Sequence, residues 1–156
     1  TITEKPSFRS CFKSKRCLIF ADGFYEWARR PGEKHKTPMY IRLKSGNPFA
    51  FAGLWSQWQG GDGTELTTAA IITTRANHLI KTIHHRMPVI LPPTSFGMWL
   101  NTETHNPPAL MSLLAPHPPG DMTMYPVSRY VNNVANDGPK CIEREGSPKQ
   151  QDLFGK

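Results

Sequence analysis

Two extended segments separated by a bend are predicted by residues Cys17–Trp27, "CLIFADGFYEW". Apolar and aromatic residues, which strands favour, fill both ends of this stretch. Between them, Asp22 and Gly23 form a pair that is typical of turns. We therefore expect a strand, a bend and a second extended segment, and the rest of the chain continues in short segments of the same kind.

Further strands are predicted toward the C-terminus. Residues 39–43 ("MYIRL") and 49–55 ("FAFAGLW") flank the turn-favouring "KSGNP" and predict a hairpin. Three other segments rich in β-favouring residues each predict a strand. They are 66–74 ("LTTAAIITT"), 87–91 ("MPVIL") and 122–128 ("MTMYPVS").

Helices are predicted only as short segments in the second half of the chain. Residues 93–100 ("PTSFGMWL") and 106–114 ("NPPALMSLL") each combine a polar cap with an early proline. Residues 77–85 ("NHLIKTIHH") predict a short helix capped by Asn77. Short strands joined by turns, with helices inserted late, indicate an α+β domain with antiparallel sheets, and the alternating units of a Rossmann fold are missing.

Composition limits the classes of function. The 156 residues suit one domain with a single core, and the formal charge of +7 favours a polyanionic partner such as nucleic acid. No apolar run approaches the roughly 20 residues that span a bilayer, so we expect no membrane contact. Three cysteines without a C-x-x-C spacing suit a reducing, cytoplasmic compartment (nucleoid-associated if bacterial), and no metal site or cofactor is expected.

Glu26 is the first candidate for chemistry. It lies between Tyr25 and Trp27 on an otherwise apolar segment. Desolvation by such neighbours raises the pKa of a carboxyl group and makes it usable as an acid or base near neutral pH. The alternative is that strand alternation turns Glu26 toward solvent while the two aromatic rings face inward.

His84, His85 and Arg86 form a second candidate group, where a helix is expected to lead into a strand. Successive strand residues point to opposite faces, so His84 and Arg86 would share one face. Histidine moves protons at physiological pH, and arginine binds phosphate with two parallel hydrogen bonds. Besides proton-transfer chemistry on a phosphate-bearing substrate, the residues allow a non-catalytic nucleic-acid-binding module or a metal-dependent hydrolase using His78, His84 and Glu26.

Five segments occur along the chain in this order: "RCLIFADGFYEW", "FAGLW", "IITTRAN", "IHHRMPVIL" and "PVSRYVNN". In these segments the chain resembles the SOS-response-associated peptidase (SRAP) family, which senses abasic sites in single-stranded DNA. The resemblance implies a barrel-like arrangement of the antiparallel sheets with short flanking helices. Residues 1–140 would then be the C-terminal part of a single SRAP domain, followed by a polar tail at 141–156.

The resemblance also implies a mechanism. In the family, an N-terminal cysteine freed by removal of the initiator methionine attacks the abasic aldehyde and closes a thiazolidine, which links protein and DNA covalently. Glu26 and His84 match the residues that assist proton transfer, so we expect them to be catalytic. Arg86 and Thr73 match positions on the DNA-phosphate side, and we assign Trp27 to the DNA-binding surface with them.

None of Cys11, Cys17 and Cys141 matches the family's nucleophile. We therefore expect the nucleophilic cysteine and a catalytic asparagine to lie upstream of Thr1, so that this chain alone is inactive.

Residues 150–154 ("QQDLF") resemble the pentapeptide by which bacterial proteins bind the sliding clamp. Gln150 and Asp152 would match its polar positions, and Leu153 and Phe154 would insert into an apolar cleft. The alternative is a chance match, or folding of these two residues back onto their own domain.

Overall fold

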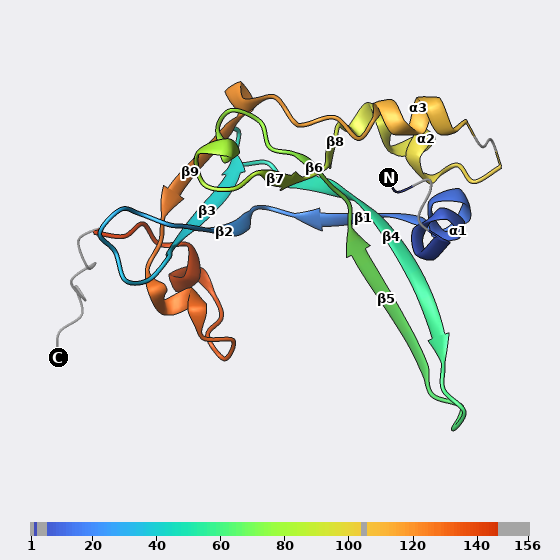
Figure 1. Ribbon diagram of the computed structural model, residues 1–156, viewed down its shortest axis with the longest axis horizontal. Helices are drawn as coiled ribbons and strands as arrows, with labels where there is room; N and C mark the ends of the chain where they lie inside the picture. The colour runs from blue at the N-terminus through green and yellow to red at the C-terminus, as the bar shows by residue number, and fades with distance from the viewer. Residues whose placement is uncertain (1, 3–5, 104–105, 147–156) are drawn as a thin grey trace, which may run out of the picture.

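The computed structural model describes residue 2, residues 6–103 and residues 106–146 (Figure 1). Short strands dominate, and each helix has three to nine residues. The strands are β1 (Arg16–Ala21), β2 (Phe24–Ala28), β3 (Thr37–Leu43), β4 (Phe49–Gln59), β5 (Glu65–Ile71), β6 (Thr73–Arg75), β7 (Arg86–Pro88), β8 (Ile90–Leu91) and β9 (Met122–Pro126).

Helical segments lie at the three places predicted in the second half of the chain, whereas the helix at residues 6–14 was not predicted. The α-helices are α1 (Pro6–Ser14), α2 (Phe96–Leu100) and α3 (Pro107–Ser112), and Asn106 caps α3 by accepting a hydrogen bond from Ala109 N. The 3₁₀ helices are η1 (Ile80–Thr82), η2 (Pro93–Ser95), η3 (Pro119–Asp121), η4 (Arg129–Asn132) and η5 (Pro139–Ile142).

In the described part of the chain the strands form three separate antiparallel sheets. One has the order β1-β4-β5 with β8 also paired to β4, the second has the order β2-β3-β9, and the third pairs β6 with β7. The antiparallel α+β class is thus confirmed. The sheets, however, do not close into a barrel.

The hairpin predicted for 39–43 and 49–55 is wrong. β3 pairs with β2 and β9, whereas β4 pairs with β1, β5 and β8. The turn itself is present, with Gly46 at φ +75°. The backbone N–H of Lys44 extends the β3 pairing by donating to Asp121 O, and Pro48 before β4 has no N–H for a ladder. The two strands therefore separate into different sheets.

Two predicted strands are each divided in two by one backbone junction. Ile72 interrupts the segment 66–74, and Val89 interrupts 87–91. Ala52 N donates to Val89 O, Ile72 N donates to Ala52 O and Val89 N donates to Ile72 O, all at 2.9 Å. This junction attaches the β6–β7 pair to the middle of β4.

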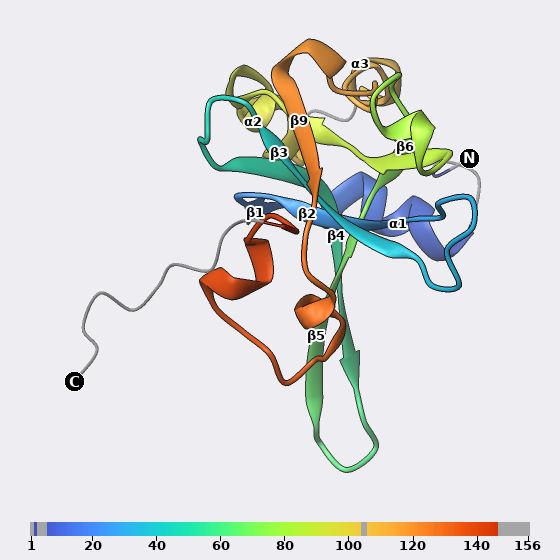
Figure 2. The same cartoon turned by 90° about the vertical axis from the view of Figure 1, so that its left-hand side faces the viewer.

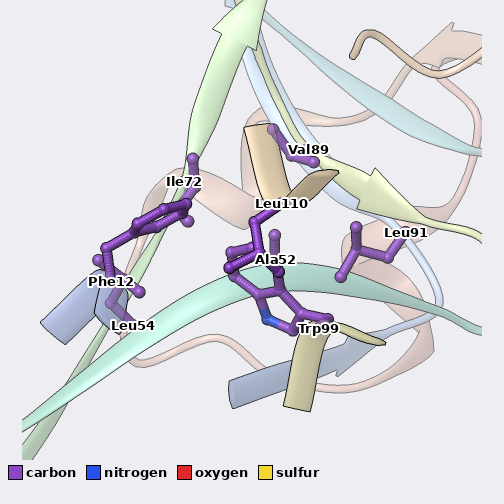
Figure 3. Packing of buried hydrophobic residues seen from close by; sticks show 8 residues of the cluster. All are labelled: Phe12, Ala52, Leu54, Ile72, Val89, Leu91, Trp99 and Leu110. Atoms are coloured by element: carbon purple, nitrogen blue, oxygen red, sulfur yellow. The ribbon is translucent and has the colours of Figure 1, made fainter. Parts of the chain in front are cut away.

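The first half of β4 is buried on both faces because it runs between two apolar clusters. Ala52 and Leu54 face the first cluster, whereas Phe49 and Phe51 face the second. Figure 3 shows the first cluster, in which Trp99 from α2 packs beside residues of α1, α3 and β4. Its buried members are Phe12, Ala52, Leu54, Ile72, Val89, Leu91, Trp99 and Leu110.

The second half of β4 leaves the body of the molecule. Together with β5 it forms a long hairpin that extends away from the other elements (Figures 1 and 2). All seven residues of β5 are exposed, and Trp58 opposes Leu66 across the hairpin.

The beginning of the segment expected to be a polar tail packs on the β2-β3-β9 sheet. Cys141 is buried, and Val127 and Arg144 form an isolated β-bridge. The structure describes residues 141–146 of this segment. The clamp-like residues 150–154 lie outside the described residues. In the described ranges we find no helix long and apolar enough to cross a membrane.

Candidate functional site

Glu26 projects from the face of β2 that turns toward the interior. On the same face, Phe24 packs edge-to-face on Phe51 with ring centroids 5.7 Å apart. Tyr25 and Trp27 occupy the opposite face, where their ring centroids lie 6.4 Å apart. The Glu26 side chain is 27% exposed, so it is half-buried and does not point freely into solvent.

A short loop between η1 and β7 carries His84 to Glu26. Asn77 Oδ1 accepts a hydrogen bond from Ile80 N at 3.0 Å, which confirms the predicted cap, although the helix is only a 3₁₀ turn. Ile80 is buried in the second cluster, and His84 N donates to Ile80 O at 2.9 Å. These contacts fix the loop so that His84 Nδ1 lies 3.9 Å from Glu26 Oε2.

The surroundings of His84 Nδ1 accommodate both of its protonation states. The atom lies 3.1 Å from Arg86 N and 3.0 Å from Arg86 O. Where Nδ1 carries no proton, it accepts a hydrogen bond from this N–H. Where Nδ1 carries a proton, in one neutral tautomer or in the imidazolium, it donates to the carbonyl, and the imidazolium also forms an ion pair with Glu26. Among the described residues, Nε2 has no hydrogen-bond partner. It is therefore available to an external group. The His85 ring lies tilted by 31° against the His84 ring, with their centroids 4.5 Å apart.

Arg86 and Thr73 meet across the β6–β7 pair. The Arg86 guanidinium donates to Thr73 O at 2.5 Å and to Thr73 Oγ1 at 2.9 Å and 3.3 Å. Both residues are exposed. The hydrogen bonds hold the cation at the surface next to the His84 loop, because Arg86 begins the strand that the loop leads into.

Trp27 lies beside Glu26 in sequence but faces the other way. Its indole Nε1 donates to Asn132 Oδ1 at 2.9 Å, and its side chain is exposed. Asn132 belongs to η4, near the C-terminus of the described chain. Asn132 lies in the segment "PVSRYVNN", but the sequence predicts no role for this residue, since only the fold brings it to β2.

The hydrolase alternative needed His78, His84 and Glu26 to share one ion. Within the residues that the structure describes, no three His, Cys, Asp or Glu side chains lie close enough to hold a metal. The His78 side chain is exposed, and only His84 and Glu26 meet. The trio on which this alternative depended is therefore not assembled.

The three cysteines lie in other environments. Cys11 packs against the first apolar cluster, and Cys141 is buried near Tyr25, whose hydroxyl donates to Cys141 O. Burial raises the pKa of the Cys17 thiol above its usual value. A raised pKa disfavours the thiolate, which is the nucleophilic form of cysteine.

Comparisons with known proteins agree with one another. A family model described as SOS response associated peptidase (SRAP) matches residues 1–134. "Abasic site processing protein YoqW" of Bacillus subtilis is 50% identical over 143 residues, covering 92% of this chain and 63% of that protein. "Abasic site processing protein HMCES" of Gallus gallus is 33% identical over 161 residues, covering 91% of this chain and 47% of that protein.

Solved structures share the fold. An X-ray structure of a protein from Bacteroides thetaiotaomicron superposes with a TM-score of 0.84 at 35% sequence identity, covering 93% of this chain and 63% of that one. A second, from Bordetella bronchiseptica, gives a TM-score of 0.72 at 27% identity, covering 82% of this chain and 62% of that one. The chain spans less than two thirds of the length of each of these relatives.

Proposed function

The chain belongs to the SOS response associated peptidase (SRAP) family, and on this premise we propose that it acts in the processing of abasic sites in DNA. Two curated relatives that it matches over more than nine tenths of its length are named abasic site processing proteins. Its net charge of +7 suits a polyanionic substrate.

The single observation that carries the proposal is the approach of Glu26 Oε2 to His84 Nδ1, at 3.9 Å. Two proton-transferring groups from different elements converge here, and His84 Nε2, which has no hydrogen-bond partner among the described residues, is open to a substrate. Arg86, held by Thr73, supplies a fixed cation beside them. This arrangement suits proton transfer on a substrate that carries phosphate.

The finer proposal is a covalent reaction with the ring-opened sugar. The amine of an N-terminal cysteine adds to the C1′ aldehyde, water leaves with a proton delivered by His84 or Glu26, and an imine forms. The thiol then adds to the imine carbon, the nitrogen takes the thiol proton, and a thiazolidine results. Because Cys11, Cys17 and Cys141 lie elsewhere, we assign the nucleophile to a segment that precedes Thr1 in the full-length gene product.

The same cysteine is exposed, in this proposal, by removal of an initiator methionine, for which the Glu26–His84 pair again supplies acid–base assistance. A non-catalytic DNA-binding module is the second candidate, and the exposed, basic β6–β7 surface favours it. The two candidates differ in one respect. Only the catalytic one requires the carboxylate of Glu26 and the imidazole of His84.

A crosslinking experiment separates them. The full-length gene product, incubated with single-stranded DNA that carries an abasic site, should form an adduct that survives a denaturing gel, and undamaged DNA should form none. Glu26→Gln or His84→Ala should slow adduct formation by about 10²–10⁴-fold, the usual contribution of positioned acid–base groups. Glu65→Gln and His78→Ala, at exposed positions, are the matched controls.

Two results would count against the proposal. If Glu26→Gln and His84→Ala form adducts as fast as the two control variants, the catalytic roles are wrong and the binding module is favoured. If the full-length protein forms no adduct with abasic DNA, the covalent reaction itself is wrong.

A further inference from the structure

The β6–β7 pair places two arginines directly opposite each other. In its antiparallel register Arg75 is the partner of Arg86, and Thr73 is the partner of Pro88. Opposite residues of such a pair project from the same face, so Thr73, Arg75 and Arg86 share one exposed surface. Like charges that face each other across two strands destabilise the pairing unless an anion lies between or beside them.

Nothing in the described chain neutralises this pair. The ion pairs of the described residues involve Arg30, His84 and His117, and no carboxylate contacts Arg75 or Arg86. The two arginines also differ from each other. Arg86 is bound to Thr73 by three hydrogen bonds, whereas the Arg75 guanidinium makes no hydrogen bond to the described residues.

Arg75 lines an open groove of about 400 Å³ between β6 and the end of α3. Apolar side chains form the α3 side of this groove, and Thr74 and Ser112 add hydroxyl groups. The lining residues are Thr74, Arg75, Met111, Ser112, Leu114, Ala115 and Pro116. A cation beside an apolar wall matches the two parts of a nucleotide backbone, its phosphate and its deoxyribose.

We propose that Arg75 and this groove form a second phosphate subsite next to Arg86, so that the β6–β7 pair binds two neighbouring phosphates of one DNA strand. The proposal rests on the proposed function and deepens it, because it states how the strand that carries the abasic site continues past the Glu26–His84 pair. Arg86 holds one phosphate in a position fixed by Thr73. Arg75, whose guanidinium makes no hydrogen bond within the described ranges, binds the next.

Salt dependence of binding tests the proposal. The full-length protein is titrated by fluorescence anisotropy with single-stranded DNA that carries a tetrahydrofuran abasic-site analogue, which has no aldehyde and so reports binding alone. Arg75→Gln should weaken binding and reduce the slope of log K against log salt by about one contact's worth. Arg75→Lys should keep the slope. Lys34→Ala, which removes an equal charge from the loop between β2 and β3, should leave the slope unchanged.

A scan with single neutral methylphosphonates then locates the contact. The wild-type protein should lose affinity at two neighbouring phosphates, Arg86→Ala should lose sensitivity at one of them, and Arg75→Gln at the other. The second subsite would be overturned if Arg75→Gln kept the wild-type salt slope and methylphosphonate sensitivity, or if Lys34→Ala lost as much slope as Arg75→Gln. Either result would leave the proposed function intact. Failure of the wild-type protein to bind the abasic strand would overturn both.

Discussion

At the residue scale, Gly23 determines how closely the start of β2 approaches β3. A Cβ atom added at Gly23 would lie 2.3 Å from the ring and hydroxyl of Tyr40. Tyr40 is buried between Tyr25 and Tyr125, with ring centroids 5.3 Å and 5.6 Å away, so its ring has little room to move. The bend between β1 and β2 therefore requires a residue without a side chain. Burial of Tyr40, followed by the charge of Asp22, also raises the pKa of its hydroxyl to about 12.

We expect Gly23→Ala to lower the free energy of unfolding by about 1–3 kcal/mol, the usual cost of overpacking a filled site. Chemical denaturation of the purified variant measures this loss. Gly61→Ala, at a turn where an added Cβ meets no atom within 4 Å, is the matched control. Equal stability of the two variants would show that β2 and β3 adjust to a side chain at the bend.

His117 is a second residue whose environment has a measurable consequence. Its Nε2 atom is buried, has no hydrogen-bond partner in the part of the chain that the structure describes, and lies 3.8 Å from Asp121 Oδ2. Burial lowers the pKa of His117, and the Asp121 carboxylate offsets only part of this effect. The folded protein therefore holds His117 neutral at a pH where the unfolded chain binds a proton.

The unfolded histidine titrates near pH 6.5, so the contribution of neutral His117 to stability is complete above this value and is lost as the pH falls below it toward the lowered folded-state pKa. Urea denaturation at pH 7.5 and pH 5.5 should show a smaller loss of stability in His117→Gln than in the wild-type protein. His78→Gln, at an exposed histidine, should lose as much as the wild-type protein, and the same loss in His117→Gln would contradict the prediction.

At the scale of elements, the segment from η4 to residue 146 holds the β2-β3-β9 sheet from outside. Tyr25, Tyr40 and Tyr125 are aligned across the three strands. The hydroxyl of Tyr25 donates to Cys141 O at 3.2 Å, and that of Tyr125 donates to Ile142 O at 3.1 Å. The Arg144 guanidinium lies 4.1 Å from the Tyr125 ring centroid. Since β2 carries Glu26, these contacts also position the candidate site.

Tyr125→Phe should destabilise the protein by about 1 kcal/mol, because it removes one hydrogen bond and retains the ring. Thermal unfolding measures the difference. Tyr130→Phe is the matched control, since the Tyr130 hydroxyl makes no hydrogen bond to the described residues and its ring still contacts Lys140. A melting temperature of Tyr125→Phe equal to that of Tyr130→Phe would mean that the bond to Ile142 contributes nothing.

At the scale of the whole molecule, the junction of Ala52, Ile72 and Val89 determines where the β6–β7 pair lies. This junction ties the β6–β7 pair to β4, and β4 is the strand between the two apolar clusters. The β6–β7 pair, which carries Arg75 and Arg86, is thereby anchored to a strand whose first half is buried on both faces. A DNA strand bound there would lie on a surface anchored to β4, beside the loop that carries His84.

The form of DNA that binds is a property of the whole surface. The full-length protein should bind single-stranded DNA with an abasic-site analogue more tightly than an intact duplex of the same sequence, since a damaged sugar must be reached outside the base stack. Affinity should fall as salt rises, because phosphate contacts release counterions. Competition titrations at two salt concentrations measure both effects. Equal affinity for the two forms of DNA, or affinity independent of salt, would argue against this surface as the DNA-binding face.

The sequence by itself determined the extended segments around Asp22-Gly23, the caps at Asn77 and Asn106, the α+β class and the family. These features are local, since alternation, turn pairs and capping residues act within a few positions of each other. Glu26 and His84 could be selected from the sequence as candidates because their residue types and their motifs are local too.

Only the tertiary structure decided which strands are neighbours. Alternation along β4 predicts that successive side chains point to opposite faces, but it does not identify the partner strand. The predicted pairing of β3 with β4 was therefore wrong. The 3.9 Å approach of Glu26 to His84, the opposition of Arg75 and Arg86 and the bond from Trp27 to Asn132 all join segments distant in sequence. Such contacts arise from burial of the two apolar clusters as a whole, which no short stretch of sequence encodes.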